Sequence, residues 1–204
     1  MVQREPKQER SARTRAAIVR AGAEVFAEMG FAAASVNKIA RRANLTLGAL
    51  YFHFESKEQL AREIVEAQPA RLALPTAAHG LRGAVATTIA WATQLLGDPM
   101  LLAGARLVMD QEYFVDREKG NSHQQWVEVL LPYLYEASRG GELKQDVDVE
   151  ALARLVVNAA TGAQMNAQLD SGRRDLPERI RQMWHFLVPL VATEEYVSKV
   201  AASI

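Results

Sequence analysis

The segment Asn44–Ala61, NLTLGALYFHFESKEQLA, gathers hydroxyl, aromatic, imidazole and ammonium side chains in a short stretch. Such groups contact phosphates and base edges when they lie on a helix in the major groove of DNA. Gly48 falls inside the helix expected over Leu47–His53, where a glycine costs about 1 kcal/mol relative to alanine. A helix that must approach another surface closely would account for this cost. Lys57, in the first turn of the next helix, is unfavourable for the helix dipole and favourable for a phosphate.

The same side chains fit a second interpretation. In a small helical subdomain, the aromatic residues would form the core, and His53 and Lys57 would be solvated. Spacing alone does not choose between a DNA-binding helix and this structural role, so both interpretations stay open at this point.

The sequence contains no recognisable motif for enzymatic catalysis. There is no cysteine, which excludes disulfides, thiolate metal ligands and cysteine nucleophiles. No HExxH motif, glycine-rich phosphate loop or nucleophile elbow is present. The histidines show no metal-ligand spacing: His53, His79, His123 and His185. Carboxylates such as Asp110 and Glu112 fit solvated helix faces. We therefore expect no enzyme, no catalytic residue, no metal site and no cofactor.

Charge is unevenly distributed along the 204 residues, although the formal net charge is zero. Residues 1–60 hold ten lysines and arginines against six acidic residues, an excess of four positive charges. This excess suggests a polyanionic partner for the N-terminal part. The charged N-terminal segment lacks the apolar run of a signal peptide, and no stretch reaches the roughly 18 apolar residues of a membrane span. We expect a cytoplasmic protein without membrane contact.

Helical periodicity runs through the whole chain, and no segment alternates convincingly as a strand. In the first helix, apolar residues recur at three- and four-residue steps from Ile18 to Met29. Gly30 is expected to end this helix in the left-handed conformation of a C-cap. Ser35 is a good N-cap for a short helix over Val36–Ala43.

The turn and helices that follow have equally local signals. Asn44 tolerates the positive φ of a tight turn, and Thr46 caps the helix Leu47–His53. Ser56 and Gln59 form a capping-box pattern at the start of the fourth helix. Two short helices around a tight turn, between two longer helices, predict a helix-turn-helix head over residues 1–60.

Residues 61–204 contain further helices separated by glycines, near Leu81–Leu96, Pro99–Asp110, Ser122–Ser138, Asp148–Leu169 and Leu176–Val191. The predicted fold class is therefore all-α.

Pro69 falls within the fourth helix as the periodicity extends it, SKEQLAREIVEAQPARLAL. Proline either kinks that helix and acts as a hinge or ends the helix early, and both alternatives remain open.

The stretch Thr14–Ala61 resembles the DNA-binding domain of TetR-family repressors. That family's helix-ending Gly-Phe, Ser/Thr cap, Ile-Ala pair, Gly-x-Leu-Tyr-x-x-Phe run and Lys-Glu-x-Leu helix start occur in order, as Gly30-Phe31, Ser35, Ile39-Ala40, Gly48–Phe54 and Lys57–Leu60. Two residues depart from the pattern, Asn44 where glycine is common and Leu47 where lysine is common. The resemblance implies DNA binding, with contacts predicted from Arg10, Arg13, Ser35, Asn37, Thr46, Leu47, Gly48, Ala49, Tyr51, His53 and Lys57.

A looser resemblance covers the segments DPMLLAGARLVMD, QQWVEVLLPYLYEA and GELKQDVDVEALARLVVNAATGAQ. They are similar to γ-butyrolactone receptors of antibiotic-producing actinomycetes, which implies that Trp126 lines an effector pocket with Thr161 and Gln164. Together with residues at helical spacing or on the preceding helices, the predicted effector contacts are Trp91, Val108, Trp126, Leu130, Thr161 and Gln164. Tryptophan and leucine at this spacing also suit a packed core, so that alternative stays open.

The resemblance further implies that residues 61–204 form a helical domain that holds a small effector and dimerises through its last two long helices. We predict a homodimeric repressor that binds a pseudo-palindromic operator in double-stranded DNA and is released by a small hydrophobic effector. A γ-butyrolactone-, furan- or butenolide-type signal controlling secondary metabolism is expected. The alternatives are a drug- or hydrophobe-sensing repressor of an efflux or catabolic gene, and a helical scaffold that binds no DNA.

Overall fold

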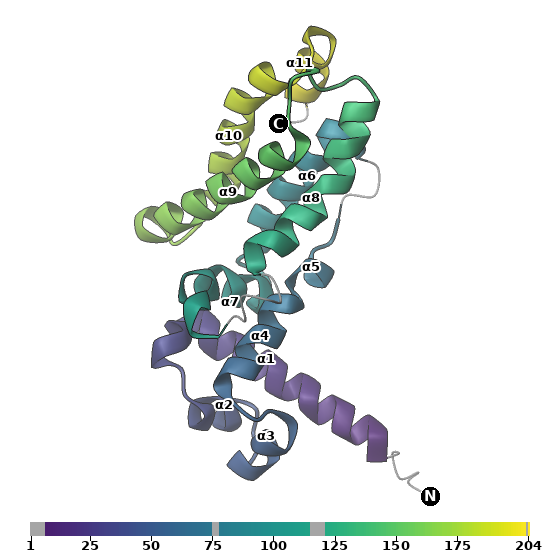
Figure 1. Ribbon diagram of the computed structural model, residues 1–204. Coiled ribbons are helices and arrows are strands. Elements are labelled where there is room, and N and C mark those ends of the chain that lie inside the picture. Colours follow the sequence, from purple (N-terminus) through teal and green to yellow (C-terminus); the bar gives the residue numbers. More distant parts are fainter. Residues whose placement is uncertain (1–6, 75–77, 115–120, 203) are drawn as a thin grey trace, which may run out of the picture. The chain divides into compact units, whose positions relative to one another are not determined.

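Every regular element is a helix in the residues that the computed structural model describes, 7–74, 78–114, 121–202 and 204 (Figure 1). The predicted all-α fold class is confirmed. Contacts divide the chain into two compact units, residues 1–68 with 98–119 and residues 69–97 with 120–204. Each unit is therefore built from two separate segments. The predicted functional division after residue 60 is a different partition and stays a prediction.

The first unit contains α1 (Lys7–Ala33), α2 (Val36–Arg42), α3 (Leu47–His53), α4 (Lys57–Glu66), α7 (Pro99–Leu107) and the 3₁₀ helix η1 (Val108–Tyr113). In this unit α1 contacts α2, α4 and α7, and α2 contacts α3. Buried apolar side chains from these helices form one core, which includes Phe26, Ile39, Leu50, Phe54, Leu60 and Leu107.

Hydroxyl side chains begin the three helices α2, α3 and α4, as predicted. Each oxygen accepts a hydrogen bond from a backbone N–H three residues ahead, at 3.1–3.3 Å: Ser35 from Lys38, Thr46 from Ala49 and Ser56 from Gln59. The capping box is modified, because the Gln59 side chain accepts from the N–H of Glu55 at 2.7 Å. Local sequence signals therefore fix where these helices start.

Two backbone positions make the turns of this unit. Asn44 adopts φ 56 between α2 and α3, as predicted. Gly30 has φ 73 and ψ 179, and one further helical turn follows it to Ala33. The positive φ requires glycine there, but the expected left-handed helical C-cap is wrong, because ψ is extended.

The helix α4 ends at Glu66, and Pro69 lies in the separate short helix α5 (Gln68–Arg71). Proline has no N–H to donate to the carbonyl oxygen of Val65. The Gln68 side chain donates to that oxygen instead, at 3.3 Å. The helix therefore ends before Pro69, and a role of Pro69 as a hinge stays a prediction.

The second unit contains α6 (Gly80–Gln94), α8 (Ser122–Arg139), α9 (Val149–Ser171), α10 (Leu176–Val191) and α11 (Glu194–Ala201). α8 contacts α6 and α9, and α10 contacts α6, α9 and α11. Buried Trp184 of α10 donates its indole N–H to the Thr88 hydroxyl of α6 at 2.7 Å. The sequence did not predict α11. None of the described helices combines the length and apolar composition needed to cross a membrane.

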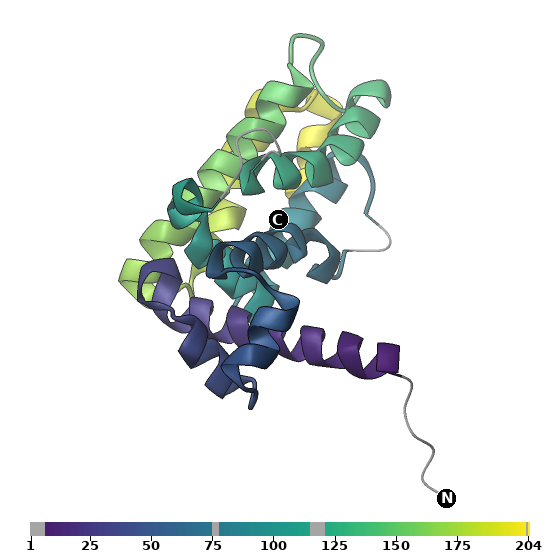
Figure 2. The same ribbon diagram turned by 60° about the horizontal axis from the view of Figure 1, so that its bottom comes forward.

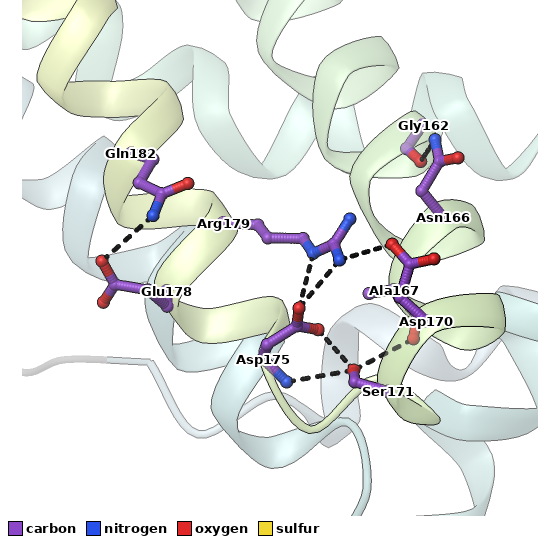
Figure 3. Close-up of polar contacts among 9 residues, drawn as sticks. All are labelled: Gly162, Asn166, Ala167, Asp170, Ser171, Asp175, Glu178, Arg179 and Gln182. Carbon is purple, nitrogen blue, oxygen red and sulfur yellow. Dashed lines mark hydrogen bonds and ion pairs between the residues drawn. The ribbon is translucent and has the colours of Figure 1, made fainter.

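Polar side chains fix the connection between α9 and α10 (Figure 3). Arg179 of α10 lies 2.7 Å from Asp170 of α9 and 2.8 Å from Asp175 in the connection. The Ser171 hydroxyl also contacts the Asp175 carboxylate. The hydrogen bond from Ser171, and next that from Arg179, lowers the pKa of Asp175. Exposed ion pairs stabilise little individually, but this set defines the geometry of the helical hairpin.

The N-terminus of α6 is capped by carboxylates from elsewhere in the second unit. The Gly80 N–H donates to Glu136 at 3.0 Å, and the Leu81 N–H donates to Glu142 at 2.8 Å. Gly80 has φ 55, and a Cβ atom there would lie 2.2 Å from a Glu142 carboxylate oxygen. Glycine is therefore required both for the backbone conformation and for the approach of the carboxylate.

We predict that Gly80→Ala lowers the free energy of unfolding by about 2–3 kcal/mol. About 1–2 kcal/mol comes from the positive φ, and about 1 kcal/mol comes from the displaced carboxylate cap. Urea denaturation measures the loss. Gly141→Ala is the control, because Gly141 has φ 69 and open space around its missing Cβ, so only the backbone cost is expected. Equal losses in both variants would contradict the role assigned to Glu142.

Candidate DNA-binding and effector sites

The helix α3 has one buried and one exposed face. Leu50 and Phe54 are fully buried in the core of the first unit. On the other side, Leu47, Tyr51 and Phe52 are 36%, 47% and 81% exposed. Phe52 is therefore not a core residue, so the interpretation in which the aromatic residues of this segment form the core does not hold for it. Three large exposed side chains on one short helix favour a surface that binds a partner.

Gly48 lies on this exposed face. A Cβ atom built at Gly48 meets no atom within 4 Å in the described part of the chain. Packing within the chain therefore does not require glycine at this position, although glycine destabilises a helix. This combination is expected where an external surface must come close to the helix backbone.

The other predicted contacts of the helix-turn-helix lie around α3. Thr46 is exposed and caps α3, and Ala49 and His53 are half-buried on it. Asn37 is exposed in the first turn of α2, and Ser35 is a half-buried cap. The exposed members of this set, with Leu47 and Tyr51, are candidate contact residues on α2, on α3 and at the cap of α3.

Arg10 and Arg13 lie on a different element, the first turns of α1. Both residues are exposed, and they precede Ile18, the first buried residue of α1. These turns extend beyond the part of α1 that α4 covers (Figure 2). Two guanidinium groups on a projecting helix suit contacts with the phosphate backbone.

Lys57 has contacts that the sequence did not anticipate. Its ammonium donates to the carbonyl oxygens of Phe31 at 2.9 Å and Ala34 at 3.1 Å, and lies 4.1 Å from the Phe31 ring centroid. These bonds attach the start of α4 to the end of α1. They explain the cation at a helix N-terminus without a phosphate, and a phosphate contact from Lys57 stays a prediction.

Ion pairs occupy several of the basic side chains of residues 1–60. Arg15 pairs with Glu63, and Arg20 lies 3.2 Å from Glu24. Arg42 lies 2.8 Å from Glu28, and its hydrogen bond lowers the Glu28 pKa. The charge available to a polyanion is therefore concentrated on fewer residues than composition alone suggests.

A small, partly open cavity of about 40 Å³ lies in the second unit. Its walls come from three helices: Thr87, Thr88 and Trp91 of α6, Trp126 and Leu130 of α8, and Val157, Ala160 and Thr161 of α9. The rings of Trp91 and Trp126 meet edge to face, with centroids 6.2 Å apart. Four predicted effector residues therefore line one apolar cavity, namely Trp91, Trp126, Leu130 and Thr161.

The other two predicted effector residues lie elsewhere. Gln164 is buried, and its side-chain oxygen accepts from the Arg173 guanidinium at 2.8 Å. This bond joins α9 to the connection before α10. Val108 follows α7 in the first unit. Neither residue lines the cavity.

The sequence reasoning missed two threonines of the cavity wall, although a signal was present. Thr87 and Thr88 precede Trp91 by four and three residues, so all three share one face of α6. Applying the helical period to Trp91 would have found them.

Phe52 was missed as a surface residue because an aromatic pattern alone does not distinguish a buried side chain from an exposed one.

Exposed apolar side chains also gather on the last two long helices. Leu155, Met165 and Leu169 of α9 and Phe186 and Leu190 of α10 are exposed. Leu169 and Phe186 are 84% and 72% exposed. Exposed apolar residues in this number on adjacent helices are typical of a protein–protein interface.

Comparisons with known proteins give a consistent result for both units. Residues 18–64 match the family model of bacterial regulatory proteins of the tetR family, and residues 78–192 match the tetracycline repressor-like C-terminal domain. The A-factor receptor protein of Streptomyces griseus is 32% identical over 188 residues, which cover 91% of this chain and 66% of that protein. The chain therefore spans about two thirds of that relative.

Solved structures show the same similarity. Native TylP, a TetR regulator from Streptomyces fradiae, has a TM-score of 0.81 and 35% identity, over 93% of this chain and 92% of that chain. A γ-butyrolactone receptor described as an ArpA-like protein has a TM-score of 0.75 and 28% identity, over 95% and 96% of the two chains.

We predict opposite effects of Gly48→Ala on stability and on DNA binding. The free energy of unfolding should rise by about 0.5–1 kcal/mol, because alanine favours the helix and no atom in the described part of the chain obstructs its methyl group. Affinity for DNA should fall about tenfold or more, because the methyl group occupies space needed by the partner. Urea denaturation and fluorescence anisotropy measure the two effects.

Gly97→Ala, in the other unit, is the control for DNA binding and should leave affinity unchanged. If Gly48→Ala kept full affinity for DNA, α3 would not approach DNA closely at this position.

Proposed function

Because the chain belongs to the TetR family of bacterial regulatory proteins, we propose that it is a homodimeric DNA-binding repressor controlled by a small hydrophobic effector. The effector is of the γ-butyrolactone, furan or butenolide type. Similarity to the A-factor receptor protein and to a γ-butyrolactone receptor supports this choice. The single observation that carries the effector assignment is the cavity that Trp91, Trp126, Leu130 and Thr161 line together.

The surface around α3 supports the DNA-binding half of the proposal. Its large exposed side chains and Gly48 leave the helix free on one side. A helix of this kind enters the major groove in helix-turn-helix proteins. Arg10 and Arg13 provide positive charge on a separate projecting element, where they would contact phosphates and raise affinity without selecting a sequence.

The cavity supports the effector-binding half. Its volume of about 40 Å³ holds roughly three water molecules, which is less than a lactone with an alkyl tail requires. In the proposed mechanism, binding moves wall side chains, and the two tryptophans are the largest of them. An effector that fits only the expanded state shifts the protein toward that state by its difference in affinity for the two.

The exposed apolar faces of α9 and α10 support a dimer. Two helices from each protomer would form a four-helix interface and bury Leu169 and Phe186. A dimer presents two α3 helices, which bind successive major grooves when they are about 34–36 Å apart. In the proposed mechanism, the effector stabilises a state with a different spacing, so the operator is released.

A DNA fragment from the region upstream of the protein's own gene tests the proposed function. We expect binding at low salt and a steep linear fall of the logarithm of affinity with the logarithm of salt concentration. Candidate lactones, furans and butenolides should release the DNA, and Trp126→Ala should weaken release without changing DNA affinity. Release by bulky drugs alone would favour a drug-sensing repressor. No binding at low salt would contradict the proposal.

We predict that Phe186→Glu disrupts the dimer, because it buries a charge in the proposed interface. Light scattering after size-exclusion chromatography should show a monomer at concentrations where the unmodified chain is a dimer. Leu96→Glu, at an exposed position that follows α6, is the control and should leave the dimer intact. If Phe186→Glu remained dimeric, the interface would have to lie elsewhere.

A further inference from the structure

The hydroxyl group of Thr87 is buried in the cavity wall without a partner. Thr87 is 2% exposed, and its oxygen has no hydrogen-bond partner among the residues that the structure describes. A buried hydroxyl without a hydrogen bond costs free energy, and such groups are uncommon in folded proteins. An unused hydroxyl in the wall of a small cavity is therefore a candidate for a ligand contact.

The other hydroxyl groups of the wall have partners within the chain. Thr161 donates to the Val157 carbonyl oxygen at 2.9 Å. Thr88 donates to the Val85 carbonyl oxygen at 2.8 Å and accepts the indole N–H of Trp184 at 2.7 Å. Each of these threonines has already used its single proton. Thr87 differs from both, because its proton is available to an acceptor on a ligand.

Charge on the ligand is restricted by the same wall. The residues that line the cavity are threonine, tryptophan, leucine, valine and alanine, so no described lining residue is ionisable. A carboxylate placed here would lose part of its hydration without gaining a cation as partner, which is unfavourable. The wall therefore suits a neutral molecule with one hydrogen-bond acceptor and an otherwise apolar surface.

We propose that Thr87 selects the effector by donating its hydroxyl proton to a carbonyl oxygen of a neutral ligand, while Trp91 and Trp126 cover the apolar part. This inference rests on the proposed effector site and adds its specificity. A cyclic ester has the required acceptor and no charge. The hydrolysed form of the same molecule, a hydroxy acid, carries a carboxylate and is excluded.

Three matched probes test the proposal on the full-length protein. γ-Decalactone has the ring, tail and carbonyl group, 2-hexyltetrahydrofuran lacks only the carbonyl, and 4-hydroxydecanoate is the hydrolysed anion. Calorimetry or tryptophan fluorescence gives each dissociation constant. The unmodified chain should bind the lactone most tightly and the anion at least tenfold more weakly than the lactone.

Thr87→Val removes the hydroxyl group and keeps the shape of the side chain. It should weaken lactone binding about 3- to 10-fold, the effect of one hydrogen bond, and leave binding of 2-hexyltetrahydrofuran unchanged. Thr87→Ser should bind the lactone nearly as the unmodified chain does. Thr93→Val is the matched control, because Thr93 is an exposed threonine of the same helix outside the cavity.

Thermal unfolding without probe separates this role from a structural one. Because the Thr87 hydroxyl has no partner among the residues that the structure describes, Thr87→Val should melt at the same temperature as the unmodified protein or higher. A melting temperature lower by about 3 °C or more, which one lost hydrogen bond would produce, would overturn the proposal. Thr93→Val measures the background of the substitution.

The binding results distinguish this inference from the proposed function. Unchanged lactone affinity in Thr87→Val, or equal affinity for lactone and anion, would overturn the role of Thr87 and leave the effector site standing. If the unmodified chain bound none of the probes and no lactone released its DNA, lactone sensing itself would fail, and the inference would fail with it.

Discussion

The position of α3 depends on the burial of two side chains, Leu50 and Phe54, in the core of the first unit. An isolated helix of seven residues is not stable in water, so packing and caps must hold it. Because both anchors lie on one face, the opposite face contributes little to folding. Tyr51 and Phe52 are exposed on that opposite face and are therefore available for contacts with a partner.

The sequence predicted best those structural features that depend on residues close together in the chain. The caps at Ser35, Thr46 and Ser56 and the positive φ of Asn44 involve atoms within three residues of one another. The sequence predicted less well what distant residues decide. The Lys57 ammonium bonds carbonyl oxygens 23 and 26 residues away, and no local pattern indicates such a contact.

The tryptophans of the second unit also show that local sequence patterns do not determine contacts between distant residues. The sequence left open whether Trp91 and Trp126 are core or pocket residues, and the structure contains tryptophans of both kinds. Trp184 is fully buried and its N–H is satisfied by Thr88, whereas Trp91 and Trp126 line the cavity. All three lie on amphipathic helices, so helical period alone gives the same answer for each. Which helices face one another decides the outcome, and this follows from the tertiary fold.

The order of the chain restricts how the proposed effector site would influence DNA binding. The cavity wall of α6 belongs to the second unit, and α7, which follows it within a few residues, belongs to the first. Asp98 caps α7 at its start by accepting from the Met100 N–H at 2.7 Å. At the other end, Asp110 accepts from the Phe31 N–H at 3.1 Å, next to the carbonyl oxygens that bind Lys57. In the proposed mechanism, an effector that displaces α6 would act through the chain that continues into α7, and the Asp110 bond attaches the end of that segment to the end of α1, on which α4 is held.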